Sequence, residues 1–211
     1  GLNIDRAPVE VLERVTIPTH SLKQHLGRLA TQAGGGVILS TCNRTEVYGV
    51  AYDVETGIRQ LREFIDTIPG DTAAESLNDH IYTLTGDDVA IHLFSVTSGL
   101  HSVALGEAQI LGQVTRALQV AGEAGTVEPV LSRMFHAAIR NSRRVRKESG
   151  LGRNRVSVSS IGVQALQKAA GDLKGLRVLL VGAGETGKLT ARALRRYGAD
   201  DITVTSRSIN R

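Results

Sequence analysis

The spacing of apolar residues changes several times along the chain and predicts short strands and amphipathic helices in turn. Two apolar or β-branched runs, Val37 to Thr41 and Glu46 to Tyr52, have the length and composition of strands. The polar segment between them, Cys42-Asn43-Arg44-Thr45, is predicted to form a loop. This pattern places Cys42 at the point where a strand ends.

Four later stretches have the apolar spacing of helices that bury one face. The positions on these predicted faces are Ile58, Leu61 and Ile65; Val89, His92, Leu93 and Val96; Ile110, Leu111, Val114, Ala117, Leu118 and Ala121; and Leu131, Met134, Phe135, Ala138, Ile139 and Val145. The segment Pro69-Gly70-Asp71 is a predicted stop, Asp87 is a predicted N-cap, and Pro129 stands just ahead of the last helix.

The glycine-rich, basic segment 150–155 is the predicted boundary between two domains, residues 1–150 and residues 151–211. The second domain is predicted to open with a helix that carries Val163, Leu166 and Ala170. The almost wholly apolar run Arg177 to Val181 then predicts a parallel strand buried on both faces. The fold class is therefore α/β, with an N-terminal α+β domain followed by the first βαβ portion of a Rossmann-like doubly wound domain.

The predicted strand runs into a G-x-G-x-x-G sequence, Gly182-Ala183-Gly184-Glu185-Thr186-Gly187, and then into a predicted helix. In this context Gly182 permits a tight turn, Gly184 lets a pyrophosphate approach the backbone, and Gly187 allows close packing. The N–H groups at the start of the helix would face the phosphates. We therefore expect a nucleotide cofactor on Gly182, Gly184, Glu185, Thr186 and Gly187.

The next predicted strand, Ile202 to Thr205, indicates which nucleotide is bound. It ends in Ser206-Arg207-Ser208, where an NAD-specific site places an acidic residue. Arg207 between two hydroxyls suits a 2′-phosphate instead, so NADPH is the expected cofactor, with Ser206 and Arg207 among its ligands. Only about two strands of a doubly wound sheet are present, so this stretch alone is expected to hold a cofactor weakly.

Composition and charge narrow the class of protein. The net charge is +4 and the pI is about 9.5, which suits a polyanionic partner. The single cysteine excludes an intrachain disulfide and fits a reducing compartment, and the sequence predicts no membrane-spanning helix, so a cytoplasmic location is expected. The sequence begins without Met and stops directly after a predicted strand, so we expect a chain truncated at both ends.

Cys42 is a candidate nucleophile, because Arg44 and Glu46 follow it closely and a nearby guanidinium favours the thiolate. His92 is the natural partner for acid–base chemistry. The alternative is that Cys42 is a small buried hydrophobe and His92 a hydrogen-bonded core histidine. The spacing of the histidines and the cysteine gives no metal-ligand set.

Several longer stretches resemble one enzyme family. Residues 40–48 read Ser-Thr-Cys-Asn-Arg-Thr-Glu-Val-Tyr, residues 98–102 read Ser-Gly-Leu-His-Ser, and residues 105–114 read Leu-Gly-Glu-Ala-Gln-Ile-Leu-Gly-Gln-Val. The opening Gly1-Leu2-Asn3 with Ala7-Pro8-Val9-Glu10 and the segment Val156-Ser157-Val158-Ser159-Ser160 add to them. In this order, the motifs resemble those of the glutamyl-tRNA reductase family over essentially the whole chain.

The resemblance implies a mechanism. The cysteine at Cys42 would attack the aminoacyl ester of glutamyl-tRNA and release the tRNA. NADPH would then reduce the enzyme thioester to glutamate-1-semialdehyde, the first committed step of five-carbon-route tetrapyrrole biosynthesis. His92 would polarise the ester or assist proton transfer. A thioester accepts hydride better than an oxygen ester, so the two-step route is chemically sensible.

The resemblance also implies a substrate pocket. Its positions match Thr41, Arg44, Glu46, Ser102, Glu107 and Gln109. Arg44 suits the side-chain carboxylate of the substrate and Glu46 its ammonium group, although the sequence leaves these pairings open. The sequence departs from the family pattern at Ile4 in place of histidine, His101 in place of aspartate and Ala108 in place of proline.

The basic helix and the family together suggest partners. Arg133, Arg140, Arg144 and Lys147 recur at helical spacing, Arg143 and Arg146 flank them, and Arg153 and Arg155 follow. This face is either a track for a tRNA phosphate backbone or a solvated helix surface. The resemblance further implies a homodimer formed through a helical domain that is absent here, a downstream aminomutase as partner, and the plastid stroma as location if the source is a plant.

Two other functions remain compatible with the residues. The chain could be a cysteine-dependent NADPH reductase of a small acyl ester or acyl phosphate, with no nucleic acid involved. It could also be a non-catalytic NADPH- or tRNA-binding module, in which case Cys42 is unreactive and His92 belongs to the core.

Overall fold

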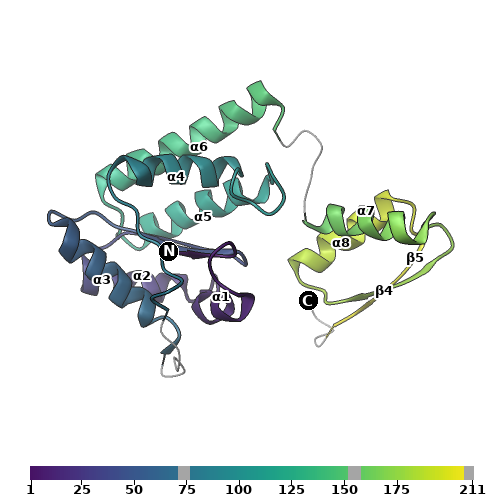
Figure 1. Cartoon of the computed structure of the whole chain (residues 1–211), viewed down its shortest axis with the longest axis horizontal. Helices are drawn as coiled ribbons and strands as arrows, with labels where there is room; N and C mark the ends of the chain where they lie inside the picture. The colour runs from purple at the N-terminus through teal and green to yellow at the C-terminus, as the bar shows by residue number, and fades with distance from the viewer. Residues whose placement is uncertain (71–76, 152–157, 207–211) are drawn as a thin grey trace. The chain divides into compact units, whose positions relative to one another are not determined.

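The computed structural model describes residues 1–70, 77–151 and 158–206. The chain divides into two compact units, Gly1–Ser102 with Ala108–Gly150, and Val103–Glu107 with Leu151–Arg211. The elements in chain order (Figure 1) are β1 Leu2–Asn3, α1 Val9–Val15, α2 Leu22–Ala33, β2 Val37–Ser40, β3 Arg44–Tyr48, α3 Val54–Asp66, α4 Asp87–Ser98, α5 Gln109–Glu123, α6 Pro129–Ser149, α7 Val158–Ala170, β4 Arg177–Val181, α8 Glu185–Arg196 and β5 Asp201–Thr205.

The first unit is built around an antiparallel sheet with the strand order β1-β3-β2. Helices α4, α5 and α6 lie on one side of this sheet and α1, α2 and α3 on the other (Figure 1). Its core includes Leu39, Phe64, Leu93 and Phe135, which are almost fully buried. Each such side chain stabilises the fold by roughly 1.5–3 kcal/mol. The central strand β3 is thus held between two layers of helices.

The turn between β2 and β3 is shorter than the sequence predicts. The hydroxyl of Thr41 accepts hydrogen bonds of 3.2 Å from the backbone N–H groups of Asn43 and Arg44, and the N–H of Thr41 donates to the Arg44 carbonyl at 2.8 Å. Arg44 and Thr45 therefore belong to the strand, and the predicted loop from Cys42 to Thr45 is wrong at its end.

The far end of β3 also differs from the prediction, because the strand ends at Tyr48 and does not reach Tyr52. The carboxylate of Asp53 accepts a hydrogen bond of 2.8 Å from the Thr56 N–H and caps α3, which starts at Val54. A chain that must enter a helix at this point cannot continue an extended ladder.

The helices predicted from apolar spacing in the first unit are confirmed as α3, α4, α5 and α6. Helix α4 is capped by Gly86, which has a φ of 57°, so the predicted N-cap Asp87 is instead the first helical residue. Helices α1 and α2 were not predicted. The signal for α2 is present in the sequence, because Leu22, Leu26 and Leu29 recur at helical spacing and are buried.

The second unit starts a Rossmann-like arrangement, with β4 and β5 parallel and in register from Arg177 with Asp201 to Val181 with Thr205. Strand β4 has the predicted bounds, but the prediction that it is buried on both faces is wrong. Helix α8 packs against it, whereas Leu179 and Val181 are 64% and 77% exposed on the opposite face. The reason is that the described residues supply no second helical layer for this sheet.

Helix α7 also buries less than its sequence predicts. Val163 is 2% exposed and joins the small core of the unit, but Leu166 is 39% exposed and Ala170 is exposed as well. The remaining buried residues of this core are Leu173, Ala193, Leu194 and Ala199. With a core of this size, only one narrow stripe of α7 is covered.

Candidate functional site

Cys42 lies in the hairpin turn between β2 and β3, and its side chain is exposed. The turn is closed by the buried Thr41, whose hydroxyl binds the backbone on the far side of Cys42. The N–H of Ile4, directly after β1, donates to the Asn43 carbonyl at 3.0 Å. Two neighbouring strand ends therefore hold the backbone around the exposed cysteine.

The buried carboxylate of Glu46 on β3 accepts hydrogen bonds from four donors. Its Oε1 accepts from Arg44 Nη1 at 2.7 Å, from the Tyr82 hydroxyl at 2.5 Å and from His92 Nε2 at 3.0 Å. Its Oε2 accepts from the Tyr48 hydroxyl at 2.5 Å. The side chain is only 4% exposed. A carboxylate this deeply buried is stable only because nearly all of its lone pairs are occupied.

These contacts keep Glu46 ionised. Burial raises the pKa of its carboxyl group, but the hydrogen bonds from His92 and Tyr48 and the charge of Arg44 outweigh burial and lower the pKa to about 2. The pKa of Tyr48 and that of Tyr82 are raised by burial and by the nearby Glu46 charge. Both phenols therefore stay protonated and act as donors to the carboxylate.

Both terminal nitrogens of the Arg44 guanidinium donate hydrogen bonds. Nη1 binds Glu46, and Nη2 donates to the backbone carbonyl of His101 at 2.6 Å. The Arg44 side chain is 4% exposed, so this is a buried ion pair. Arg44 thereby ties strand β3 to the segment that follows α4.

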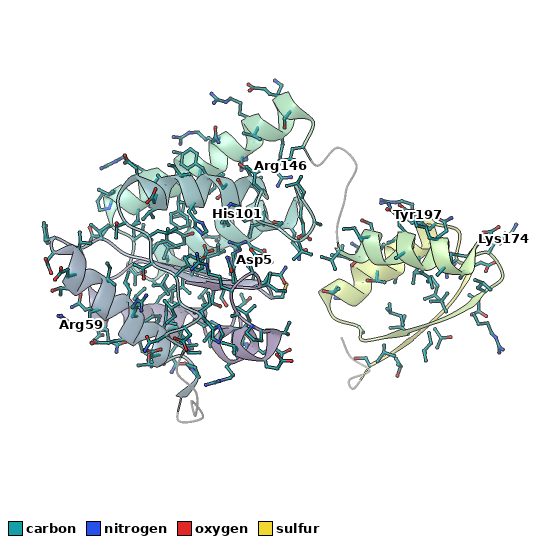
Figure 2. All side chains as sticks on the ribbon, in the orientation of Figure 1. Asp5, Arg59, His101, Arg146, Lys174 and Tyr197 are labelled. Atoms are coloured by element: carbon teal, nitrogen blue, oxygen red, sulfur yellow. The ribbon has the colours of Figure 1, made fainter. Side chains whose placement is uncertain are left out.

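His92 lies on α4 and is 12% exposed at its side chain. Its Nε2 faces Glu46, and the Tyr82 hydroxyl lies 3.4 Å from the same nitrogen. The ring of His101, labelled in Figure 2, lies 5.4 Å from the His92 ring, centroid to centroid. Burial, followed by the charges of His92 and Arg44, lowers the pKa of His101. A neutral ring is therefore favoured at the position where the family pattern has an aspartate.

The other predicted pocket residues lie after α4 and at the start of α5. Ser102 is half-buried, and its N–H donates to the Gly99 carbonyl at 3.4 Å. Glu107 is half-buried, and burial raises the pKa of its carboxyl group. Gln109 is exposed on α5 and lines a hollow that also includes Ser40. The hydrogen bonds thus join Arg44, Glu46 and His92 to one another. Gln109 is not part of this network and borders the hollow that includes Ser40.

The glycine-rich turn has the geometry that a nucleotide needs. Gly182 has a φ of 109°, and its N–H donates to the Thr205 carbonyl at 2.7 Å. Gly184 is the N-cap of α8 and makes no side-chain cap bond, and an added Cβ there would meet no described atom within 4 Å. The start of α8 therefore has backbone N–H groups and open space for a phosphate, which fits a dinucleotide.

The structure describes three of the four other residues that are predicted to bind the cofactor. Glu185 is the first residue of α8. Thr186 is exposed, and its carbonyl accepts a hydrogen bond of 3.4 Å from the Ser159 hydroxyl. Ser206 is exposed after β5. Arg207, on which the choice of NADPH depends, lies outside the described residues.

Substitution of Gly187 tests the close packing that is expected in this turn. An added Cβ would lie 2.1 Å from the Gly182 carbonyl oxygen, so Gly187→Ala should destabilise the second unit by about 1–3 kcal/mol in urea unfolding. In the matched variant Gly162→Ala on α7, the new Cβ meets no described heavy atom within 4 Å. That change should be neutral or stabilising by up to about 1 kcal/mol. Equal stabilities for the two variants would contradict the packing.

The predicted basic face of α6 is exposed at most of its positions. Arg133, Arg140, Arg143, Arg144 and Lys147 are exposed, whereas Arg146 is half-buried and donates to the Ser98 carbonyl at 3.3 Å. Burial lowers the pKa of Arg146. Arg153 and Arg155 lie outside the described residues. Arg146 therefore anchors α6 to α4. The exposed residues form a cationic surface on α6: Arg133, Arg140, Arg143, Arg144 and Lys147.

The described parts of the chain contain neither a metal-ligand cluster nor a membrane-spanning helix. In residues 1–70, 77–151 and 158–206, no group of three or more His, Cys, Asp or Glu side chains is arranged to hold a metal ion. Within the same ranges, no helix combines the length and the apolar character needed to cross a membrane.

Comparison with known sequences identifies the family. The family profile described as the N-terminal domain of glutamyl-tRNAGlu reductase matches residues 1–149. The chain belongs to the glutamyl-tRNA reductase family. A second profile, shikimate / quinate 5-dehydrogenase, matches residues 164–211 and confirms that the second unit begins a Rossmann-like domain of the dehydrogenase type in this glutamyl-tRNA reductase relative.

Individual glutamyl-tRNA reductases align along the whole chain. Those of Carboxydothermus hydrogenoformans and Aquifex aeolicus are 41% and 40% identical over all of it, which corresponds to 47% and 51% of their own lengths. The solved glutamyl-tRNA reductase from Methanopyrus kandleri superposes with a TM-score of 0.64 at 31% identity, over 98% of this chain and 48% of that one. The chain therefore spans about half the length of these family members.

The structure adds two residues that the sequence did not single out. Tyr48 lies two positions after Glu46 on the same face of β3, so strand alternation could have indicated it. Tyr82 lies between α3 and α4, outside any helix or strand, and no spacing in the sequence connects it with Glu46. Its hydroxyl is placed by tertiary packing alone.

Proposed function

We propose that this chain is the acyl-transfer half of a glutamyl-tRNA reductase, together with the start of its NADPH-binding domain. Residues 1–150 would recognise and bind the glutamyl group, and residues 151–211 would form part of the cofactor domain. The observation that supports this most is the exposed Cys42 in a tight turn, directly followed by a strand whose buried Glu46 binds Arg44 and the half-buried His92. A thiol on the turn that leads into a fixed polar network suits transfer of an acyl group.

The first chemical step forms a thioester. The Cys42 thiol gives up its proton and its sulfur bonds to the carbonyl carbon of the glutamyl ester, while the bond from that carbon to the ribose oxygen of tRNA breaks. The proton lost by the thiol returns to this leaving oxygen through His92. Thr41, by closing the turn, holds the sulfur in a fixed place relative to the strand.

Substrate recognition would use the remaining residues of the pocket. Arg44, Ser102, Glu107 and Gln109 are the proposed ligands of the glutamyl group. Because both terminal nitrogens of Arg44 are engaged, a substrate carboxylate would have to share this guanidinium with Glu46 or the His101 carbonyl.

The reduction step requires a hydride donor, and NADPH is the proposed one. When bound, it supplies the hydride that converts the thioester to an aldehyde and frees the Cys42 sulfur. Gly182, Gly184 and the start of α8 would hold its pyrophosphate, as the open N-terminus of that helix suggests. Ser206 and Arg207 are the proposed ligands of the 2′-phosphate.

Glutamyl-tRNA is the proposed substrate, and the cationic surface of α6 is its proposed phosphate contact. Arg140 and Arg143, together with His136, line a hollow of about 690 Å³ between α5 and α6. Arg140→Ala and Arg143→Ala should each weaken tRNA binding and reduce the slope of log Kd against log salt by about 0.7–0.9. The control Arg59→Ala, at an exposed arginine on α3, should leave the slope unchanged. Equal slopes in all variants would contradict this contact.

Assembly and location follow from the family and are also proposals. The whole protein would form a homodimer through a helical domain that these residues do not include, and it would pass its aldehyde to an aminomutase. We propose a cytoplasmic location, or the plastid stroma in a plant.

Incubation of the chain with glutamyl-tRNA tests the function. We expect free tRNA to be released and a glutamyl group to be found on Cys42 by mass spectrometry after a rapid acid quench. Folded protein that gives neither product would overturn the proposal. Uncharged tRNA should compete with the reaction, whereas a reductase of small acyl esters or acyl phosphates would be insensitive to it. A binding module without catalysis would leave Cys42 unmodified.

A further inference from the structure

The buried carboxylate of Glu46 already accepts four hydrogen bonds from protein groups. A carboxylate offers about four lone-pair sites. Three donors already share Oε1, from Arg44, Tyr82 and His92, and Oε2 accepts from Tyr48. With 4% of its side chain exposed, Glu46 presents little surface to a substrate ammonium.

The same contacts determine which nitrogen of His92 carries a hydrogen. An ionised carboxylate only accepts hydrogen bonds, so the Nε2 that faces Glu46 Oε1 at 3.0 Å must be the one that donates. In the neutral ring, Nδ1 is then the bare nitrogen. Among the described residues, no hydrogen bond to the side chain of His92 involves Nδ1. The ring is 12% exposed, so a substrate group can still reach it.

We propose that Glu46 is a positioning residue, held by Tyr48 and Tyr82, which fixes the hydrogen of His92 on Nε2 so that Nδ1 is the nitrogen that exchanges the proton. This inference rests on the proposed acyl transfer. In that reaction Nδ1 takes the proton of the Cys42 thiol and gives it to the leaving ribose oxygen, and Nε2 keeps its hydrogen throughout. The proposal replaces the pairing of Glu46 with the substrate ammonium.

The neighbours of the ring support a fixed orientation. The groups around the Glu46–His92 pair come from three separate segments: Arg44 and Tyr48 from β3, Tyr82 from the segment before α4, and His101 from the segment after it. The guanidinium of Arg6 lies over the Tyr82 ring at 5.5 Å. The Tyr48 ring packs edge-on against Phe135 at 5.1 Å, which fixes its hydroxyl. Rotation of the carboxylate would break several contacts together.

The first test is the tautomer of His92 in the wild-type chain. The protein is labelled with 15N-histidine, and the His92 signals are assigned by their absence in His92→Gln. In the neutral form of the ring, hydrogen on Nε2 should be in at least about tenfold excess over the other tautomer, as one charge-assisted hydrogen bond supplies. Hydrogen on Nδ1 with a bare Nε2 would overturn the proposal. This measurement needs no variant of Glu46 and no activity.

The second test separates positioning from substrate binding. Acylation of Cys42 is measured with a small glutamyl ester and with the glutaryl ester that lacks the α-amino group. Glu46→Gln should slow both esters by the same factor, about tenfold or more, and should remove the tautomer preference. Slowing of the glutamyl ester alone would show that Glu46 binds the ammonium and would refute the proposal. If neither ester acylates wild-type Cys42, the proposed function fails, and the NMR result still decides the tautomer.

Tyrosine variants provide a test that does not unpair Arg44. Tyr48→Phe and Tyr82→Phe each remove one donor from Glu46 and keep the ring, so each should slow both esters by about 3- to 10-fold with an unchanged ratio between them. Tyr52→Phe is the matched control, because Tyr52 is fully exposed, and it should behave as wild type. Wild-type rates in both Tyr48→Phe and Tyr82→Phe would contradict their positioning role.

Discussion

Replacement of Cys42 by serine is expected to lower semialdehyde formation by the full-length enzyme by at least about a thousandfold. A serine hydroxyl does not ionise near neutral pH and is a far weaker nucleophile than a thiol. Any oxygen ester that formed would also accept hydride less readily than a thioester. Mass spectrometry of the chain after incubation with glutamyl-tRNA should therefore find no glutamyl adduct in the variant.

The fold should survive this change, because Cys42 is exposed in a turn whose backbone is held by Thr41. We expect the free energy of unfolding of Cys42→Ser to lie within about 0.5 kcal/mol of wild type. Cys42→Ala should lose activity to a similar extent, which would separate the loss of the nucleophile from any effect of the serine hydroxyl. Normal turnover by Cys42→Ser would exclude the thioester mechanism.

Replacement of Glu46 by glutamine is expected to destabilise the first unit by about 3–5 kcal/mol at neutral pH, because it leaves the buried guanidinium of Arg44 without its anion. Urea unfolding at pH 7 measures this difference. The control is Glu63→Gln, which removes an exposed carboxylate 3.9 Å from Arg59 and should change stability by less than about 1 kcal/mol.

The contribution of Glu46 should also depend on pH. Its pKa in the folded protein is about 2, against an ordinary value of 4.5, so folding favours the ionised form. The stabilisation, about 3 kcal/mol, is present above pH 4.5 and is lost as the pH falls from there towards 2. The stability difference between wild type and Glu46→Gln should therefore shrink over this range. A difference that stays constant down to the acid limit would show that the carboxylate does not have the proposed environment.

Local patterns in the sequence were sufficient for much of the fold. Helices α3 to α6 and strand β4 follow from the spacing of apolar residues, because each element buries one face or strip of its own side chains. The glycine turn follows from the need for a left-handed φ at Gly182 and for contact between Gly187 and the Gly182 carbonyl. These requirements act within a few residues, so they can be read along the chain.

Burial of the second unit could not be predicted in the same way. The apolar run of β4 fits a strand covered on both sides, but Leu179 and Val181 are exposed. Apolar character reports what a strand can bury, whereas the layers around it depend on other segments of the domain. The exposure of Leu166 on α7 has the same cause.

By itself, the sequence determined the family motifs, the place of Cys42 at a strand end and the glycine turn that fits a nucleotide. Only the tertiary structure decided the surroundings of Glu46. Tyr82 and His92 lie 36 and 46 positions after it, and no periodicity links residues so far apart. Hydrogen bonds between buried polar groups depend on how the strand and the helices pack, and that packing is a property of the whole core.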